Sequence, residues 1–116
     1  QIIEKAINLL ETKGWTQYTY ARDEDGNEIN RMEPGACSFC LSGALSRARN
    51  DLMPDSVPGD ASYEEYGMAR RLVRDVIQKK YGDQMIIEYN DTEGRTKEEV
   101  IALLREANSV VQSDID

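Results

Sequence analysis

The two cysteines of the chain share one motif, Cys37-Ser-Phe-Cys40, and this spacing occurs both in metal sites and in thiol–disulfide enzymes. A structural zinc site takes four ligands, most often Cys and His. The sequence contains no histidine and no third cysteine, so only carboxylates or a second copy of the chain would complete the set. We therefore expect no metal site formed by one chain alone.

A redox role for this motif would require an exposed Cys37 at the start of a helix, where the helix dipole lowers the thiol pKa. Cys37 does precede a predicted helix, but Pro34-Gly35 interrupts the strand that leads into such motifs in thioredoxin-like units. Cys40 falls in phase with the apolar residues of that helix, where a small thiol packs well. We favour a core role for Cys40, with redox chemistry at Cys37 and metal binding as the alternatives.

The sequence offers no recognisable catalytic set. Without histidine there is no Ser–His or Cys–His nucleophile and no imidazole for acid–base chemistry near neutral pH. The acidic turn that begins at Asp23 does not match a calcium loop, since its sixth position is Glu28 instead of Gly and its twelfth is Pro34 instead of Glu. We expect no catalytic residue and no cofactor, and an enzyme that uses Asp91 or Cys37 is the weakest of three hypotheses.

Positive charge is concentrated on two predicted helices, in the arginines Arg47, Arg49, Arg70, Arg71 and Arg74. If the two helix faces adjoin, they could hold a phosphate-bearing ligand or an acidic partner surface, and we expect Arg70 and Arg74 at such a site. The simpler interpretation, which we favour, is that Arg71 pairs with Asp75 one helical turn away and the other arginines are solvated.

The segment 89–96, Tyr-Asn-Asp-Thr-Glu-Gly-Arg-Thr, connects a predicted strand to a capped helix. Asn90 and Asp91 can bond nearby backbone amides, and Arg95 can clamp the Asp91 carboxylate and fix the angle between the two elements. That structural task is enough to explain the motif. The alternative is a polar pocket in which Tyr89, Asn90, Asp91 and Arg95 bind a ligand, because loops often carry functional sites.

Apolar residues at helical spacing predict four amphipathic helices, over residues 2–13, 38–50, 63–81 and 97–112. Capping-box patterns precede the last two helices, at Ser62 with Glu65 and at Thr96 with Glu99. The small residues 42–44 would let another element approach the second helix closely.

Strand-forming residues on both sides of a polar turn predict a hairpin over residues 15–32 with its tip at 23–27. Residues 85–89 predict one further short strand. Together these elements predict a single α+β domain over residues 1–116, with four helices packed on a small antiparallel sheet formed by the hairpin and that strand.

The charge balance restricts the partners. Fourteen basic residues stand against 22 acidic ones, a net charge of −8, and such a surface repels phosphate, so a nucleic-acid partner is disfavoured. No apolar run approaches the roughly 18 residues that a membrane span needs. We therefore expect a cytoplasmic protein that does not associate with membranes.

Three landmarks together resemble a known family: Gly14-Trp-Thr-Gln17, Cys40-Leu-Ser-Gly-Ala-Leu45, and Ile86-Ile-Glu-Tyr-Asn-Asp91 followed by Arg95-Thr96 and Glu99-Val100. The family consists of small proteins of unknown function from bacteriophages and bacteria, often actinobacteria and their phages, that share a C-x-x-G-A-[L/I] helix and an N-D-x-x-x-R-T-x-x-E-V segment. The resemblance covers about residues 3 to 107. By position the family cysteine is Cys40, whereas Cys37 departs from the pattern and Tyr89 stands where Trp is expected.

The resemblance implies a phage accessory gene and supplies no mechanism. Our leading hypothesis is a non-enzymatic protein, encoded by a phage or prophage, that binds a host or phage protein in the host cytoplasm. The second hypothesis is a protein that binds a small phosphorylated or nucleotide-like ligand through its arginine-rich helix faces.

Overall fold

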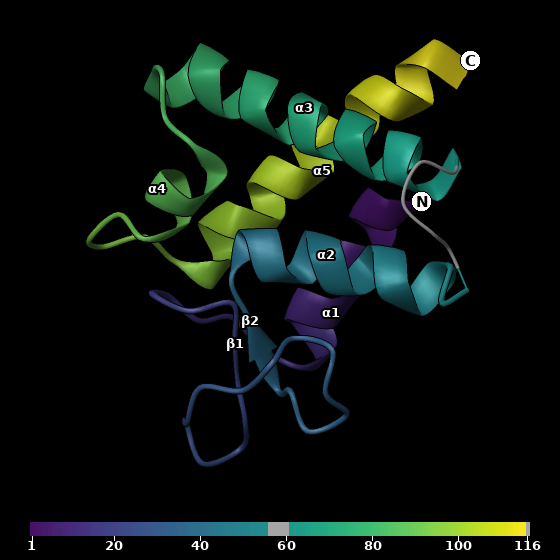
Figure 1. The fold of residues 1–116 in the computed structure, drawn as a ribbon. Coiled ribbons are helices and arrows are strands. Elements are labelled where there is room, and N and C mark those ends of the chain that lie inside the picture. The colour runs from purple at the N-terminus through teal and green to yellow at the C-terminus, as the bar shows by residue number, and fades with distance from the viewer. Residues whose placement is uncertain (56–60, 116) are drawn as a thin grey trace.

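Five helices and one two-stranded antiparallel sheet make up the described part of the chain, residues 1–55 and 61–115 of a computed structural model (Figure 1). In chain order these are α1 (Ile2–Thr12), β1 (Ala21–Arg22), β2 (Ser38–Phe39), α2 (Leu41–Leu52), α3 (Ala61–Tyr81), α4 (Ile86–Asn90) and α5 (Lys97–Ile115). The predicted mixture of helices with a small antiparallel sheet is confirmed, but the structure has one helix more than predicted.

The core forms where the four longer helices meet. Helix α1 packs on both α2 and α5, and α3 packs on α5 and on α2. Figure 1 shows α3 and α5 on one side of α2, and the sheet with its loops on the other. The apolar faces that the sequence predicts supply the largest fully buried side chains of these helices, Ile2, Leu10, Leu41, Leu45, Ile77 and Leu104.

The predicted strand over residues 85–89 is wrong, because residues 86–90 form helix α4 and Met85 is its N-cap. The Tyr89 N–H donates to the Met85 carbonyl at 3.0 Å, and Ile86, Tyr89 and Asn90 are all buried. Those three positions lie on one face of a helix. In a strand, Ile87 would lie on the same face as the buried Tyr89, but Ile87 is exposed. Burial of this helical face therefore outweighs the strand preference of the paired isoleucines.

The predicted hairpin over residues 15–32 is also only partly correct. Its polar tip is a real turn, since the Asp23 N–H donates to the Asn27 carbonyl at 2.8 Å. The backbones of Arg22 and Glu28 also form an isolated antiparallel β-bridge. The ladder that follows is different, because Ala21 and Arg22 pair with Phe39 and Ser38 of β2. Residues 38 and 39 are thus strand instead of helix, and α2 begins only after Cys40.

The remaining helix boundaries lie close to those predicted. Thr96 and Glu99 form the expected capping box, with the Glu99 N–H donating to Thr96 Oγ1 at 3.2 Å and the Thr96 N–H to Glu99 Oε1 at 2.9 Å. Helix α3 begins at Ala61, so Ser62 lies inside the helix and is not its N-cap, and its side chain lies outside the described part. No helix in the described residues is long and apolar enough to cross a membrane.

The close approach expected at residues 42–44 is confirmed at Gly43. A Cβ atom at this position would lie 2.2 Å from the Tyr20 carbonyl oxygen, far inside van der Waals contact. The segment before β1 therefore runs directly across the first turn of α2. This crossing places Tyr18, Thr19 and Tyr20 beside the start of α2 and the end of α4.

Candidate functional site

Asn90 is the hub of the polar network at this crossing. Its side chain is fully buried, and its Oδ1 accepts from the Trp15 indole N–H at 2.7 Å and from the Leu41 N–H at 2.9 Å. Its amide nitrogen donates to the Thr16 carbonyl at 3.1 Å and to Asp91 Oδ1 at 3.0 Å. Both lone pairs and both hydrogens of the carboxamide thus have protein partners, as a buried polar group requires.

These bonds join three parts of the chain. Leu41 is the first residue of α2, so Asn90 satisfies one of the backbone amides that a helix start leaves unpaired. The Gln17 side chain adds two bonds from its Nε2, to the Asn90 carbonyl at 3.0 Å and to the Thr92 carbonyl at 3.1 Å. The segment 15–17, the start of α2 and the end of α4 therefore form one rigid unit.

Asp91 binds the backbone of Tyr18 and not Arg95, so the predicted clamp between Asp91 and Arg95 is wrong. Its Oδ1 accepts the Tyr18 N–H at 3.0 Å, and Tyr18 has a φ of 72°. A residue other than glycine rarely adopts this left-handed backbone, which costs on the order of 1–2 kcal/mol. The Asp91 carboxylate thus helps to hold Tyr18 in a strained conformation.

Arg95 instead packs into the junction between α4 and α5. Its Nε donates to the Tyr89 carbonyl at 3.1 Å, and its guanidinium carbon lies 3.9 Å from the centre of the Tyr89 ring. The ring of Tyr81 and the carboxylate of Glu99 complete its surroundings, at 4.9 Å and 3.4 Å. Only 8% of the Arg95 side chain is exposed, and burial raises the pKa of the Tyr89 hydroxyl, so both groups are held inside the molecule.

Asp91 and Asn90 line a cavity of about 140 Å³, which we call the tyrosine pocket; its other lining residues are Tyr18, Thr19, Tyr20, Cys40 and Ile87. Its rim is apolar and accessible. The exposed fractions are 67% for Tyr18, 44% for Tyr20 and 42% for Ile87. The pocket therefore combines an exposed aromatic rim with a polar floor that is fixed by hydrogen bonds.

Cys40 is buried, as expected, but it caps α2 instead of lying within it. Its Sγ accepts the Gly43 N–H at 3.2 Å. Burial raises the pKa of the Cys40 thiol, the Asp91 charge adds to this effect, and the bond from Gly43 only partly opposes it. The thiol is therefore protonated near neutral pH, which is the opposite of what an activated nucleophile needs.

Cys37 lies outside the tyrosine pocket. It is partly exposed, and its thiol lies 3.3 Å from the Gly35 carbonyl oxygen. Both cysteines are free thiols. Within the described residues, no three Cys, Asp or Glu side chains are grouped so that they could hold a metal ion.

The predicted arginines divide between two places. Arg70, Arg71 and Arg74 line a second opening of about 390 Å³, which we call the arginine groove; its other lining residues are Gly67, Asp75, Gln78, Met85 and Ile86. Arg70 Nη1 donates to Ser42 Oγ at 2.9 Å and to the Tyr66 hydroxyl at 3.3 Å. Among the described residues, Arg71 and Asp75 do not form the predicted ion pair.

Arg47 and Arg49 have other roles on α2. Arg47 forms an ion pair with Asp51 at 2.8 Å and donates to the carbonyls of Arg31 and Glu33 at 2.7 Å and 3.0 Å. The guanidinium carbon of Arg49 lies 4.4 Å from the centre of the Tyr63 ring. Arg47 thus fixes the loop before β2, and the five arginines do not form a single surface.

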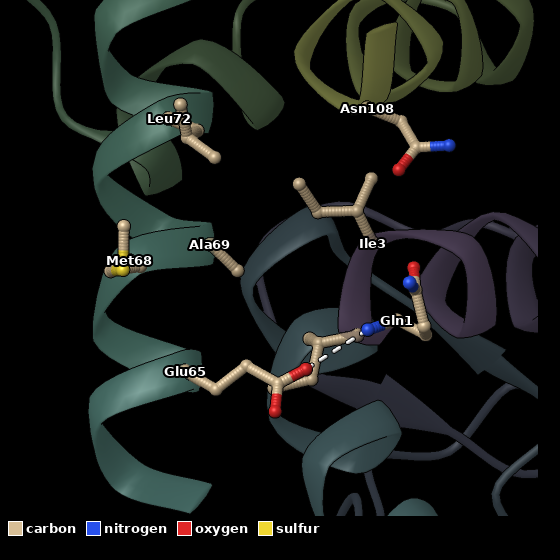
Figure 2. Close-up of a pocket in the computed structure, with 8 residues that line it drawn as sticks. Gln1, Ile3, Glu65, Met68, Ala69, Leu72 and Asn108 are labelled. Atoms are coloured by element: carbon tan, nitrogen blue, oxygen red, sulfur yellow. Dashed lines mark hydrogen bonds and ion pairs between the residues drawn. The ribbon is translucent and has the colours of Figure 1, made fainter. Parts of the chain in front are cut away.

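A third cavity lies between the start of α1 and helices α3 and α5 (Figure 2). Figure 2 shows Ile3, Ala69 and Leu72 pointing toward it, and these apolar side chains supply no group for acid–base or nucleophilic chemistry. Glu65 at its edge accepts from the backbone nitrogen of Gln1 at 2.9 Å. The cavity is a gap between packed apolar side chains rather than a candidate catalytic site.

Sequence reasoning finds Asn90 and Asp91 but misses the residues that surround them. Trp15, Tyr18 and Tyr20 are predicted as strand residues, and Ile87 as part of another strand. The available signal is the aromatic spacing in Tyr18-Thr-Tyr20, next to polar residues and outside any apolar periodicity. Of the predicted ligand-binding residues, Asn90 and Asp91 share one cavity, Arg70 and Arg74 share another, and Tyr89 and Arg95 pack against each other.

Fold and site together define a small α+β protein whose polar network presents an aromatic surface. A family model described as a family of unknown function (DUF6197) matches residues 1–110, and the chain belongs to this family. No curated protein and no solved structure matches the chain.

Proposed function

We propose that this protein acts by binding another protein through the rim of the tyrosine pocket. The observation that carries the proposal is Tyr18, which is 67% exposed although its backbone is strained and held by Asp91. Large exposed aromatic side chains dominate the energy of protein–protein interfaces. Strain that the surrounding network maintains at an exposed residue is typical of functional positions.

Rigidity supports this proposal. Asn90, Asp91 and Gln17 bind the segment that carries the tyrosines at several backbone atoms. A side chain that is already positioned loses less conformational entropy when a partner docks. Tyr18, Tyr20 and Ile87 thus supply apolar contact area on a frame that is fixed in advance.

The same geometry argues against an enzyme. Burial raises the pKa of the Cys40 thiol, so the thiol is protonated near neutral pH, whereas a nucleophilic cysteine acts as the thiolate. Asp91 Oδ1 accepts from the Tyr18 N–H and the Asn90 amide, so this carboxylate has a structural task in the network. The site is therefore better suited to recognition than to nucleophilic attack by Cys40.

We also propose the biological setting that the sequence landmarks imply. The Cys40-x-x-Gly43-Ala-Leu helix and the Asn90-Asp91 segment with Arg95-Thr96 support a protein encoded by a phage or prophage. Its partner is then a host or phage protein in the host cytoplasm.

The test is capture of a partner by the immobilised protein from host lysate, followed by measurement of the dissociation constant with the purified partner. Tyr18→Ala should weaken binding at least tenfold, because it removes a side chain of the hot-spot type, on the order of 2 kcal/mol. Leu52→Ala, which alters an exposed apolar residue at the far end of α2, is the matched control and should bind like the wild type.

Tyr18→Gly separates binding from stability. Glycine adopts a positive φ without steric cost, so this variant should be as stable as the wild type or up to about 1 kcal/mol more stable. It should nevertheless lose the partner as Tyr18→Ala does. Retained capture by both variants, or turnover of a small substrate by the wild type, would contradict the proposal.

The competing hypothesis is that a small phosphorylated ligand binds in the arginine groove. All of its charged donors come from one helix, and its other wall consists of Met85 and Ile86. A compact phosphate is usually surrounded by converging donors such as backbone amides. We therefore favour a protein partner and test the phosphorylated ligand in the experiment described below.

A further inference from the structure

The arginine groove concentrates positive charge on an acidic molecule. The chain has a net charge of −8, yet the groove holds three arginines, Arg70, Arg71 and Arg74, against one carboxylate, Asp75. Because the rest of the surface repels anions, this local excess would determine where an anionic partner docks and in which orientation.

The three guanidinium groups differ in how they are held. Arg70 is fixed, because it donates to Ser42 and Tyr66. Arg71 and Arg74 are exposed and form no ion pair in the described part of the chain. A planar guanidinium matches a carboxylate through two parallel hydrogen bonds, so the two exposed arginines suit acidic side chains.

Gly67 is a second, independent observation at the same place. It lies within α3, where glycine is the least favourable residue apart from proline. A Cβ added there would meet nothing within 4 Å, so packing inside the molecule does not require glycine. Because Gly67 has no side chain, the helix backbone beside the arginines is uncovered, and a bound chain can approach it closely.

The groove is elongated. Positions 67, 70, 71, 74, 75 and 78 follow one face of α3, and residues 67 to 78 span about 16 Å at the helical rise of about 1.5 Å per residue. This length equals about five residues of extended chain. Met85, which is 61% exposed on the opposite wall, offers an adaptable apolar contact.

We propose that the arginine groove binds an acidic segment of the partner protein, with carboxylates on Arg71 and Arg74 and an apolar side chain against Met85. This inference rests on the proposed function, since it specifies the chemistry of the same partner. Helix α4 and the residue before it connect the two surfaces, because Met85 and Ile86 line the groove and Ile87 lines the tyrosine pocket. One partner can therefore contact both.

The test uses fluorescence anisotropy with a dye-labelled peptide Glu-Asp-Leu-Glu-Asp-Leu, and its amide counterpart Gln-Asn-Leu-Gln-Asn-Leu as the control probe. The acidic peptide should bind and the amide peptide should not. Arg71→Glu should lower the affinity about tenfold or more. Lys79→Glu changes the net charge equally on the same helix but outside the groove, and should stay within about twofold of the wild type.

Gly67→Ala is the most specific variant. It should raise the melting temperature, because alanine is the better helix former, and yet weaken binding of the acidic peptide. Unchanged peptide affinity in Gly67→Ala and Arg71→Glu would overturn the inference. Equal losses in Arg71→Glu and Lys79→Glu would also overturn it, since only net charge would then matter.

Two other occupants would be visible in the same measurements. If inorganic pyrophosphate binds more tightly than the peptide, and this binding is lost on substitution of Arg70 and Arg74, the groove is a site for a compact phosphorylated ligand and the inference is overturned. A concentration-dependent dimer in analytical ultracentrifugation that Arg71→Glu dissociates would make a second copy the occupant, with the same consequence.

The failure of this inference is distinguishable from the failure of the proposed function. If a captured partner depends on Tyr18 but not on Arg71, the partner-binding role stands and the acidic segment is wrong. If the acidic peptide binds as expected but no captured protein depends on Tyr18, the role of the tyrosine pocket fails and the groove's preference for acidic chains stands.

Discussion

Asn90 shows how a single side chain can organise a fold. Each hydrogen and lone pair of its carboxamide has a partner, although the residue is completely buried. Trp15 lies 75 residues away along the chain and Leu41 lies 49 residues away. The end of α4 therefore determines where the tyrosine-bearing segment and the start of α2 lie.

Asn90→Ala should lower the free energy of unfolding by about 3 kcal/mol, because it leaves the Trp15 and Leu41 N–H groups buried without an acceptor. Urea denaturation measures this loss. Asn8→Ala, on the exposed side of α1, should stay within about 0.5 kcal/mol of the wild type. A loss of less than about 1 kcal/mol at Asn90 would show that water replaces the carboxamide.

The sequence predicts the importance of Asn90 and Asp91 but not their partners. Asn and Asp after a run of apolar residues predict bonds to nearby backbone amides. Both side chains do accept backbone N–H groups, but these belong to Leu41 and Tyr18, far away in the sequence. The nearest cation, Arg95, is the obvious partner for Asp91 when only the loop is considered. The actual donor to Asp91 is the Tyr18 N–H, 73 residues away along the chain. The sequence around Asp91 does not indicate which distant amide packs against its carboxylate.

At the scale of elements, the long helices can be predicted from sequence, while the short elements depend on their surroundings. Apolar periodicity defines α1, α3 and α5 to within a few residues, because each buries one continuous face. Helix α4 has five residues, too few for a period to be distinguished from strand alternation. The pairing of Ala21 with Phe39 is likewise set by the fold and not by a local turn.

A substitution at Gly43 tests the close crossing of the Tyr20 backbone over α2, on which the tyrosine pocket depends. Gly43→Ala should lower the free energy of unfolding by about 2 kcal/mol despite the better helix propensity of alanine, because its Cβ would collide with the Tyr20 carbonyl. Gly67→Ala, which meets nothing within 4 Å, is the matched control and should gain about 0.5–1 kcal/mol. Equal stabilities in chemical denaturation would mean that the segment at residue 20 moves away freely.

At the scale of the whole molecule, buried ionisable groups link stability to pH. Burial raises the pKa of the Cys40 thiol and the pKa of the Tyr89 hydroxyl, and the nearby Arg95 charge only partly opposes the shift at Tyr89. Both groups are neutral when protonated. The unfolded chain therefore releases these protons at lower pH than the folded protein does, and alkaline solution favours unfolding.

The free energy of unfolding should begin to fall as the pH rises above 9.0, the ordinary pKa of the Cys40 thiol, by up to about 1.4 kcal/mol per pH unit. Tyr89 adds its share above 10.0, its own ordinary value. Urea titrations between about pH 8 and pH 10 measure the slope. Cys40→Ala should remove the first part of this fall, whereas Cys37→Ala, at a partly exposed position, should keep it. An identical slope in Cys40→Ala would assign the alkaline loss to groups other than the thiol that caps α2.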